Sequence, residues 1–67
     1  MEQLTPRERD VISQISIGLS NKGIARALGI SEGTVKIHLH NLYCKLELGN
    51  RTKLAMWAVD HSRSASA

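Results

Sequence analysis

The stretch NKGIARALGISEGTVKIHLHNLYCKL, residues 21–46, contains two helical patterns joined by only three residues. Its apolar residues recur at the spacing of an amphipathic helix both before and after the joint, Gly29-Ile30-Ser31. A joint this short, with glycine at its first position, does not suit a relaxed hairpin of two long helices. We therefore predict a sharply angled helix-turn-helix over about residues 20–40, formed by helices at 21–28 and 32–46.

Capping residues place two further helices on either side of this motif. Thr5, Pro6 and Glu8 form the pattern of a capping box with proline at the first helical position. Asn50 is suited to cap a last helix, and the small polar residues at 62–67 predict a disordered tail. No segment alternates as a strand does, so the predicted fold class is all-α. The expected helices span residues 6–17, 21–28, 32–46 and 51–61.

The length of the chain limits what it can enclose. Its 67 residues form a single domain, and a domain of this size buries only about 60% of the surface of its unfolded chain. This leaves no room for an enclosed active-site cavity beside a core. No glycine-rich phosphate loop occurs either. We therefore predict that the protein is not an enzyme and that it holds no cofactor.

The charge of the chain is modestly basic. Nine Lys and Arg residues stand against six Asp and Glu residues, which gives a net charge of +3. Residues 31–53 contain four of the positive and two of the negative residues, a local excess of two. This excess is compatible with a polyanionic partner such as nucleic acid.

The sequence carries no targeting signal that we recognise. The N-terminus, MEQLTPRERD, is polar from its second residue, unlike a signal peptide. No apolar run approaches the roughly 20 residues of a membrane span. The expected location is the cytoplasm, with no membrane partner.

One large side chain of the 32–46 helix points away from the expected core. At roughly 100° per residue, Ile37 lies nearly opposite the stripe that faces the core, beside Lys36 and two histidines. An isolated exposed isoleucine is common in soluble proteins, so its neighbours decide how it is interpreted. The stripe itself is formed by Val35, Leu39, Leu42 and Leu46.

The neighbours of Ile37 suit the edges of DNA bases. Gly33, Lys36, His40 and Asn41 share the outer side of the first turns, the part of a helix-turn-helix that enters the major groove. A lysine donates to O6 and N7 of guanine, and an aliphatic side chain packs on the methyl group of thymine. Glycine has no side chain to hold the backbone away from the duplex. We therefore predict that this strip of residues reads DNA.

Further polar residues around this strip are candidate contacts to DNA phosphates. Each of them, taken singly, is more often a solvated side chain, but they converge on one side of the motif. Ser31 also stands at a helix start, where free N–H groups bind anions. The candidate phosphate contacts are Lys22, Ser31, Thr34, His38, Asn41 and Lys45.

Four segments of the chain resemble the LuxR-type DNA-binding domain found in NarL/FixJ-type response regulators of two-component systems. They are LTPRERDV (4–11), GLSNKGIARALGIS (18–31), GTVKIHLHNLYCKL (33–46) and NRTKLA (50–55). The resemblance implies a four-helix module whose third helix reads DNA, with Lys36, Ile37 and His40 at the base-reading positions. His40 stands where the family often has lysine or another long polar residue, and Gly23 where it usually has a charged or amide residue.

The 51–61 helix carries apolar residues that its inner face does not use. Its expected inner face is formed by Leu54, Trp57, Ala58 and His61. Met56 and Val59 lie off this face, and although two exposed aliphatic residues are ordinary, the resemblance implies that this helix pairs two copies on a two-fold DNA site. The implied partners are double-stranded DNA and a second copy of the chain, with RNA polymerase as a further candidate.

Metal binding and docking to another protein are the competing interpretations. His38 and His40 diverge by roughly 160° on a helix, so they cannot share a metal ion. His40 and Cys44 can, but two ligands are fewer than the four of a structural zinc site, and no metal site is predicted. The alternative function is a helix-turn-helix protein-interaction module without DNA binding. Such a module would lose little salt dependence when Lys36 is removed.

Overall fold

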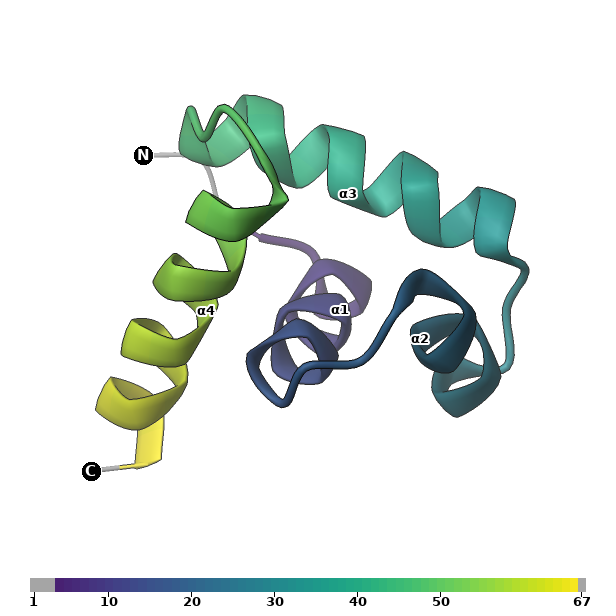
Figure 1. Ribbon diagram of the computed structural model, residues 1–67, viewed down its shortest axis with the longest axis horizontal. Helices are drawn as coiled ribbons and strands as arrows, with labels where there is room; N and C mark the ends of the chain where they lie inside the picture. The colour runs from purple at the N-terminus through teal and green to yellow at the C-terminus, as the bar shows by residue number, and fades with distance from the viewer. Residues whose placement is uncertain (1–3, 67) are drawn as a thin grey trace.

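The computed structural model describes the backbone of residues 4–66 and the side chains of residues 4–61. Within these residues the chain forms four α-helices and no strand (Figure 1). The helices are α1 (Pro6–Ser16), α2 (Asn21–Leu28), α3 (Glu32–Leu46) and α4 (Arg51–Ser66). The prediction of an all-α fold is confirmed.

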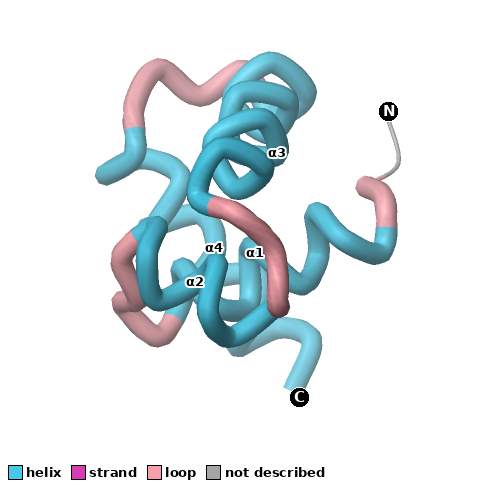
Figure 2. Tube along the Cα trace, turned by 90° about the vertical axis from the view of Figure 1, so that its right-hand side faces the viewer, coloured by secondary structure: helices cyan, strands magenta, loops and turns pink. Residues whose placement is uncertain are grey.

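Helix α1 lies at the centre of the packing and contacts each of the other three helices, while α2 also packs against α3. Helix α3 runs across the top of the domain in Figure 1, and the view of Figure 2 keeps it above the other helices. All four helices contribute to one buried core, as their amphipathic patterns predict. The core consists of Val11, Ile12, Ile15, Ile24, Ala25, Val35, Leu39, Leu42, Leu54 and Ala58.

Local sequence signals set the start and the end of α1. The Oγ1 of Thr5 accepts a hydrogen bond from the N–H of Glu8 at 3.1 Å, and the N–H of Thr5 donates to Oε1 of Glu8 at 2.9 Å. This reciprocal pair is the predicted capping box. The helix ends at Ser16, one residue before the predicted end, and Gly18 follows with a left-handed φ of +87°.

The joint between α2 and α3 has the predicted short form. Gly29 adopts φ +69°, which a glycine reaches without steric cost, and the N–H of Ile30 donates back to the carbonyl of Ala25 at 3.0 Å. Ser31 then caps α3 by accepting from the N–H of Thr34 at 3.1 Å. Three residues therefore end one helix, turn the chain and start the next.

Helix α3 ends at a left-handed residue that is not glycine. Glu47 has φ +54°, and the N–H of Leu48 donates to the carbonyl of Tyr43 at 3.0 Å. The N–H of Glu47 bonds the carbonyl of Cys44 at 3.4 Å, which completes a Schellman arrangement. A glutamate at this position carries a steric cost that a glycine avoids.

Helix α4 is longer than predicted. It continues to Ser66, so the expected end at residue 61 and the disordered tail at 62–67 are wrong for residues 62–66; Ala67 lies outside the described residues. The physical reason is that no glycine or proline follows His61 to stop the helix, and alanine and arginine favour it. None of the helices in the described part of the chain is long and apolar enough to cross a membrane.

Candidate nucleic-acid interface

The outward-pointing residues of α3 lie on the side opposite the core. Lys36, Ile37 and His40 are exposed, and we call these three residues the outer face. Ile37 keeps 62% of its surface accessible. On the opposite side of the same helix, Val35 and Leu42 are fully buried. The predicted division of α3 into a packed side and an open side is therefore confirmed.

The start of α3 is held by two hydroxyl groups. Ser31 Oγ accepts from the N–H of Thr34 and lies 2.9 Å from Thr34 Oγ1. Ser31 is exposed and Thr34 is half-buried. The Ser31 side chain thus caps the helix, and the Thr34 hydroxyl bonds it, which fixes the first turn and leaves Ser31 at the surface.

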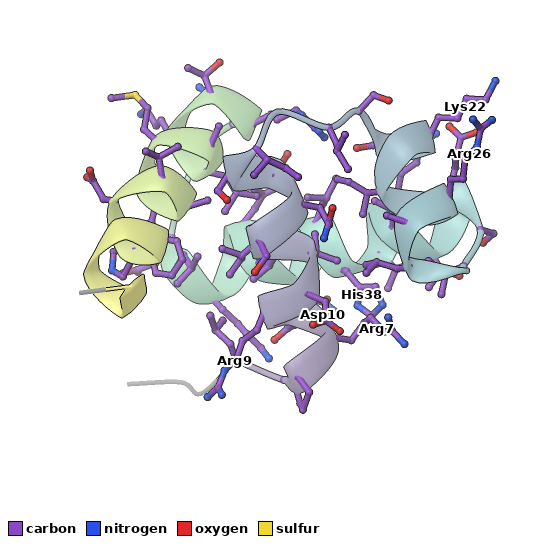
Figure 3. All side chains as sticks on the ribbon, turned by 90° about the horizontal axis from the view of Figure 1, so that it is seen from below. Arg7, Arg9, Asp10, Lys22, Arg26 and His38 are labelled. Atoms are coloured by element: carbon purple, nitrogen blue, oxygen red, sulfur yellow. The ribbon has the colours of Figure 1, made fainter. Side chains whose placement is uncertain are left out.

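Helix α2 presents a second exposed cation, Arg26, beside the predicted Lys22. Lys22 and Arg26 are both exposed and stand one helical turn apart. Figure 3 shows both side chains reaching out from the same side of α2. The i, i+4 spacing was the available signal for Arg26, because residues at this spacing share a helix face.

The flank of α3 expected to carry His38 and Asn41 is only partly open. Asn41 is exposed, whereas His38 is half-buried. Figure 3 looks at the molecule from below α3 and shows His38 in the same part of the view as Arg7 and Asp10 of α1, which form an ion pair at 3.6 Å. His38 therefore lies to the side of the outer face.

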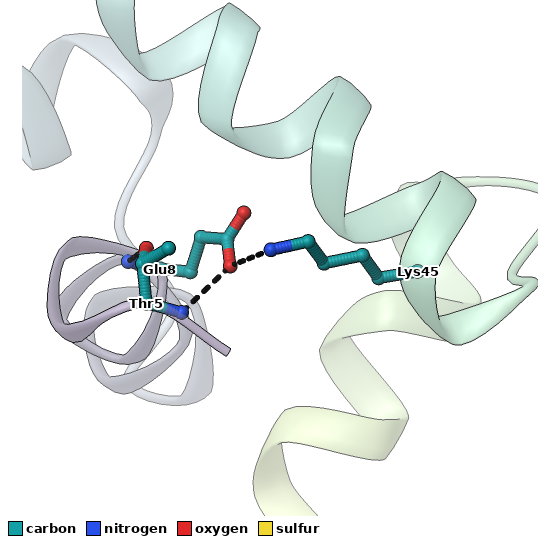
Figure 4. A network of polar contacts seen from close by, with 3 residues as sticks. All are labelled: Thr5, Glu8 and Lys45. Carbon is teal, nitrogen blue, oxygen red and sulfur yellow. Dashed lines mark hydrogen bonds and ion pairs between the residues drawn. The ribbon is translucent and has the colours of Figure 1, made fainter. Parts of the chain in front are cut away.

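Lys45 is turned inward, onto α1. Its Nζ lies 2.8 Å from Oε1 of Glu8, the oxygen that also accepts from the N–H of Thr5 (Figure 4). The Glu8 side chain is only 3% exposed and that of Lys45 25%. The phosphate contact predicted for Lys45 stays a prediction, but its ammonium group is engaged here, because a buried carboxylate needs a charged partner and Lys45 supplies it.

This environment shifts the pKa of Glu8. Burial acts to raise the pKa, but hydrogen bonds from Lys45 and from the backbone of Thr5, with the charge of Lys45, outweigh it. The net result is a pKa below the ordinary value, so that Glu8 is ionised at neutral pH. No local sequence pattern predicts this pair, because its members stand 37 positions apart.

The exposed side of α4 carries a small open apolar hollow. Ala55, Met56, Val59 and Asp60 line it. Met56 is 66% exposed and Val59 39%. Trp57 turns the other way and stacks on the ring of His61, with the ring centroids 3.6 Å apart. The two residues predicted to lie off the inner face therefore lie at the surface, on one side of the helix.

His40 and Cys44 lie close together on α3. The Nε2 of His40 is 3.8 Å from Sγ of Cys44, and the thiol is exposed. Within the described residues, no group of three or more His, Cys, Asp or Glu side chains is placed to hold a metal ion. We therefore consider His40 together with Lys36 and Ile37 of the outer face.

The chain is similar in sequence to a known protein family and to several bacterial regulatory proteins. The chain matches the family described as bacterial regulatory proteins, luxR family, over residues 2–58. It is 55% identical over 60 residues to the uncharacterized transcriptional regulatory protein YhcZ of Bacillus subtilis (strain 168), covering 90% of this chain and 28% of YhcZ.

Two relatives from Escherichia coli (strain K12) are similar at nearly the same level. The CsgBAC operon transcriptional regulatory protein is 50% identical over 60 residues, which are 90% of this chain and 28% of that protein. The nitrate/nitrite response regulator protein NarL is 49% identical over 57 residues, which are 85% of this chain and 26% of NarL. The chain thus spans about a quarter of the length of these relatives.

Proposed function

Because the chain belongs to the luxR family of bacterial regulatory proteins, we propose that it is a sequence-specific DNA-binding domain of a transcription regulator and that α3 enters the major groove. One observation carries the proposal: Lys36, Ile37 and His40 are exposed together on the side of α3 that the core does not use. A face that lies outside the core is open to a partner.

The side chains of the outer face suit the floor of the major groove. Lys36 donates to O6 and N7 of a guanine, and Ile37 packs on the methyl group of a thymine. His40 offers one ring nitrogen as a donor or an acceptor to a base edge one turn further along the helix. Gly33, which is also exposed, lets the backbone of the first turn approach the duplex.

Phosphate contacts on both sides of the groove would fix the position of α3. Lys22 and Arg26 extend from α2, the helix that crosses the DNA backbone in this motif. The first turn of α3 offers N–H groups and the exposed hydroxyl of Ser31. The proposed phosphate contacts are Lys22, Arg26, Ser31, Thr34, His38 and Asn41.

We also propose that two copies pair through α4 on a two-fold DNA site. The exposed side chains of Met56 and Val59 support this assembly. The area that so short a helix offers falls below the roughly 1,200 Å² of a stable interface, so we expect a monomer in free solution and a dimer on DNA. The bacterial cytoplasm as the location and RNA polymerase as a further partner are proposals from the family resemblance alone.

Selection from a pool of random DNA duplexes tests the proposal directly. The 67-residue chain should enrich a consensus sequence. A plot of the logarithm of its binding constant for that sequence against the logarithm of the salt concentration should be linear, with a slope of about −0.9 for each phosphate neutralised. If no sequence is enriched, and the chain instead binds a protein with an affinity that hardly depends on salt, the protein-interaction module is supported and DNA binding is not.

A further inference from the structure

The first residue of α4 is tied to the first residue of α2. The guanidinium of Arg51 donates from Nη2 to the backbone carbonyl of Leu19 at 2.8 Å, and from Nη1 to Oδ1 of Asn21. Leu19 lies in the joint between α1 and α2, and Asn21 opens α2 directly after its cap, Ser20. One half-buried side chain therefore connects α4 to the entrance of the helix-turn-helix.

The residue type matters for this connection. A guanidinium presents several N–H donors in a rigid planar fork, so it can satisfy two acceptors at a fixed relative position. A lysine ammonium at the same place has three donors on one rotatable nitrogen and sets no plane. Arg51 thus fixes a direction as well as a distance between α4 and α2.

The packing of the helices gives this connection its importance. Helix α4 packs chiefly against α1, whereas α3 packs against α1 and α2. The orientation of α4 relative to α3 therefore depends on the short joint at residues 47–50, on the shared contact with α1 and on the Arg51 fork. Over the 29 Å length of the domain, a tilt of about 5° moves the far end by about 2–3 Å, close to the roughly 3.4 Å rise of one base pair.

We propose that Arg51 is a positioning residue that sets the separation of the two α3 helices in the DNA-bound dimer, and with it the half-site spacing that the dimer accepts. The proposal rests on the proposed function, because it takes α4 as the pairing surface and α3 as the reading helix. Arg51 acts here through the angle between these helices and touches neither a base nor the second copy.

This role is tested by measuring binding to a set of DNA duplexes. One duplex carries a single half-site, and the others carry two half-sites at the preferred spacing or at a spacing changed by one or two base pairs. Wild type should lose about 10-fold or more of its cooperativity when the spacing changes by one base pair. In Arg51→Met, changing the spacing by one base pair should lower the cooperativity by less than about 3-fold. The affinity of this variant for a single half-site should stay within about 3-fold of wild type. Lys53→Met, which removes an exposed cation from the same turn of α4, should keep the wild-type preference.

Two more variants separate positioning from folding. Arg51→Lys keeps the charge and loses the fork, and Asn21→Ala removes one acceptor while installing a good helix former. Both should flatten the spacing preference, and the double variant should add little to either. If these variants keep a sharp preference, or if half-site and double-site affinity fall equally, the proposal is overturned.

The failure of the proposed function has a different signature. Wild type would then show no preferred duplex or no cooperativity at any spacing, whatever stands at residue 51. The angle between α3 and α4 in the free chain, measured from residual dipolar couplings of backbone amides, is an independent readout. It should change in Arg51→Met and Asn21→Ala and not in Lys53→Met; an unchanged angle in all three rejects the role of Arg51.

Discussion

Lys45, in the last turn of α3, and Glu8, in the first turn of α1, meet across the domain with Nζ 2.8 Å from Oε1. Glu8 uses the same oxygen to close the capping box with Thr5. The ion pair therefore joins a local signal at the start of α1 to the C-terminal end of α3. Helix α3 is held at its other end by the Ser31 cap, so both of its ends are fixed.

Acid should weaken the fold through Glu8. The pKa of Glu8 lies below its ordinary value of 4.5 in the folded chain, so its ion pair stabilises the fold fully above that value. The contribution is lost as pH falls through the folded-state pKa. Thermal unfolding followed by circular dichroism from pH 6 down to pH 2 should show this loss. The melting temperature of Glu8→Gln, which cannot ionise, should fall less steeply below pH 4.5 than that of wild type. Parallel curves for the two proteins would contradict the assignment.

Removal of Lys36 should relax base specificity. Lys36→Ala should weaken binding to the selected consensus by about 1–3 kcal/mol and reduce the preference at one position of the half-site. Gel-shift titrations against the consensus and its single-base variants measure both effects. Lys53→Ala, an exposed cation on α4, is the matched control and should leave the base preference unchanged. An equal loss on every sequence would make Lys36 a phosphate contact only.

Ile37 should recognise a thymine methyl group. Ile37→Ser should reduce the preference for thymine at its position, since the apolar contact is lost. A duplex with uracil in place of that thymine lacks only the methyl group and should weaken wild-type binding to a similar degree. Ile37→Ser should in turn bind the thymine and uracil duplexes equally. Wild type that ignores the missing methyl group would refute this contact.

A charge on the exposed side of α4 should uncouple the two copies on DNA. Val59→Glu should abolish cooperative filling of a two-fold site, because it places like charges opposite each other, while single half-site affinity stays nearly intact. Ile17→Glu is the matched control, since Ile17 is an exposed aliphatic residue at the end of α1. If Val59→Glu fills both half-sites as cooperatively as wild type, the pairing surface lies elsewhere.

Glycine at position 47 should stabilise the domain. Glu47 has φ +54°, and replacing it removes the steric cost of the left-handed conformation while keeping the two backbone hydrogen bonds of the α3 terminus. Glu47→Gly should raise the free energy of unfolding by up to about 1 kcal/mol, as measured by urea denaturation. Glu47→Val, a β-branched residue in the same conformation, should lower it. A less stable glycine variant would show that the glutamate side chain has a stabilising role.

The features that could be predicted from the sequence depend on interactions between residues close together in the chain. Thr5, Ser31 and Gly29 act on groups within five residues of themselves, so the capping box, the α3 cap and the short joint could be predicted. The side of α3 on which Ile37 lies followed from helical periodicity alone.

The contacts between distant segments could not be predicted in this way. Lys45 and Arg51 read as surface cations in the sequence, yet one pairs with a carboxylate 37 positions away and the other with Asn21, 30 positions away. No periodicity within a helix encodes such a pair, because it depends on how α1 brings the other helices together. The extension of α4 was missed for a different reason: small polar residues after His61 favour a loop by composition but contain nothing that stops a helix.

The division of α3 into a packed side and an open side also bears on how such a domain can evolve. Most substitutions at exposed positions change stability by about 0.5 kcal/mol or less, so Lys36, Ile37 and His40 can be exchanged while the buried residues of α3 keep the helix in place. A duplicated copy of this chain could therefore drift toward a new target through these three codons. Apart from proline, which costs about 3 kcal/mol inside a helix, its stability would set little limit on which residues are tried.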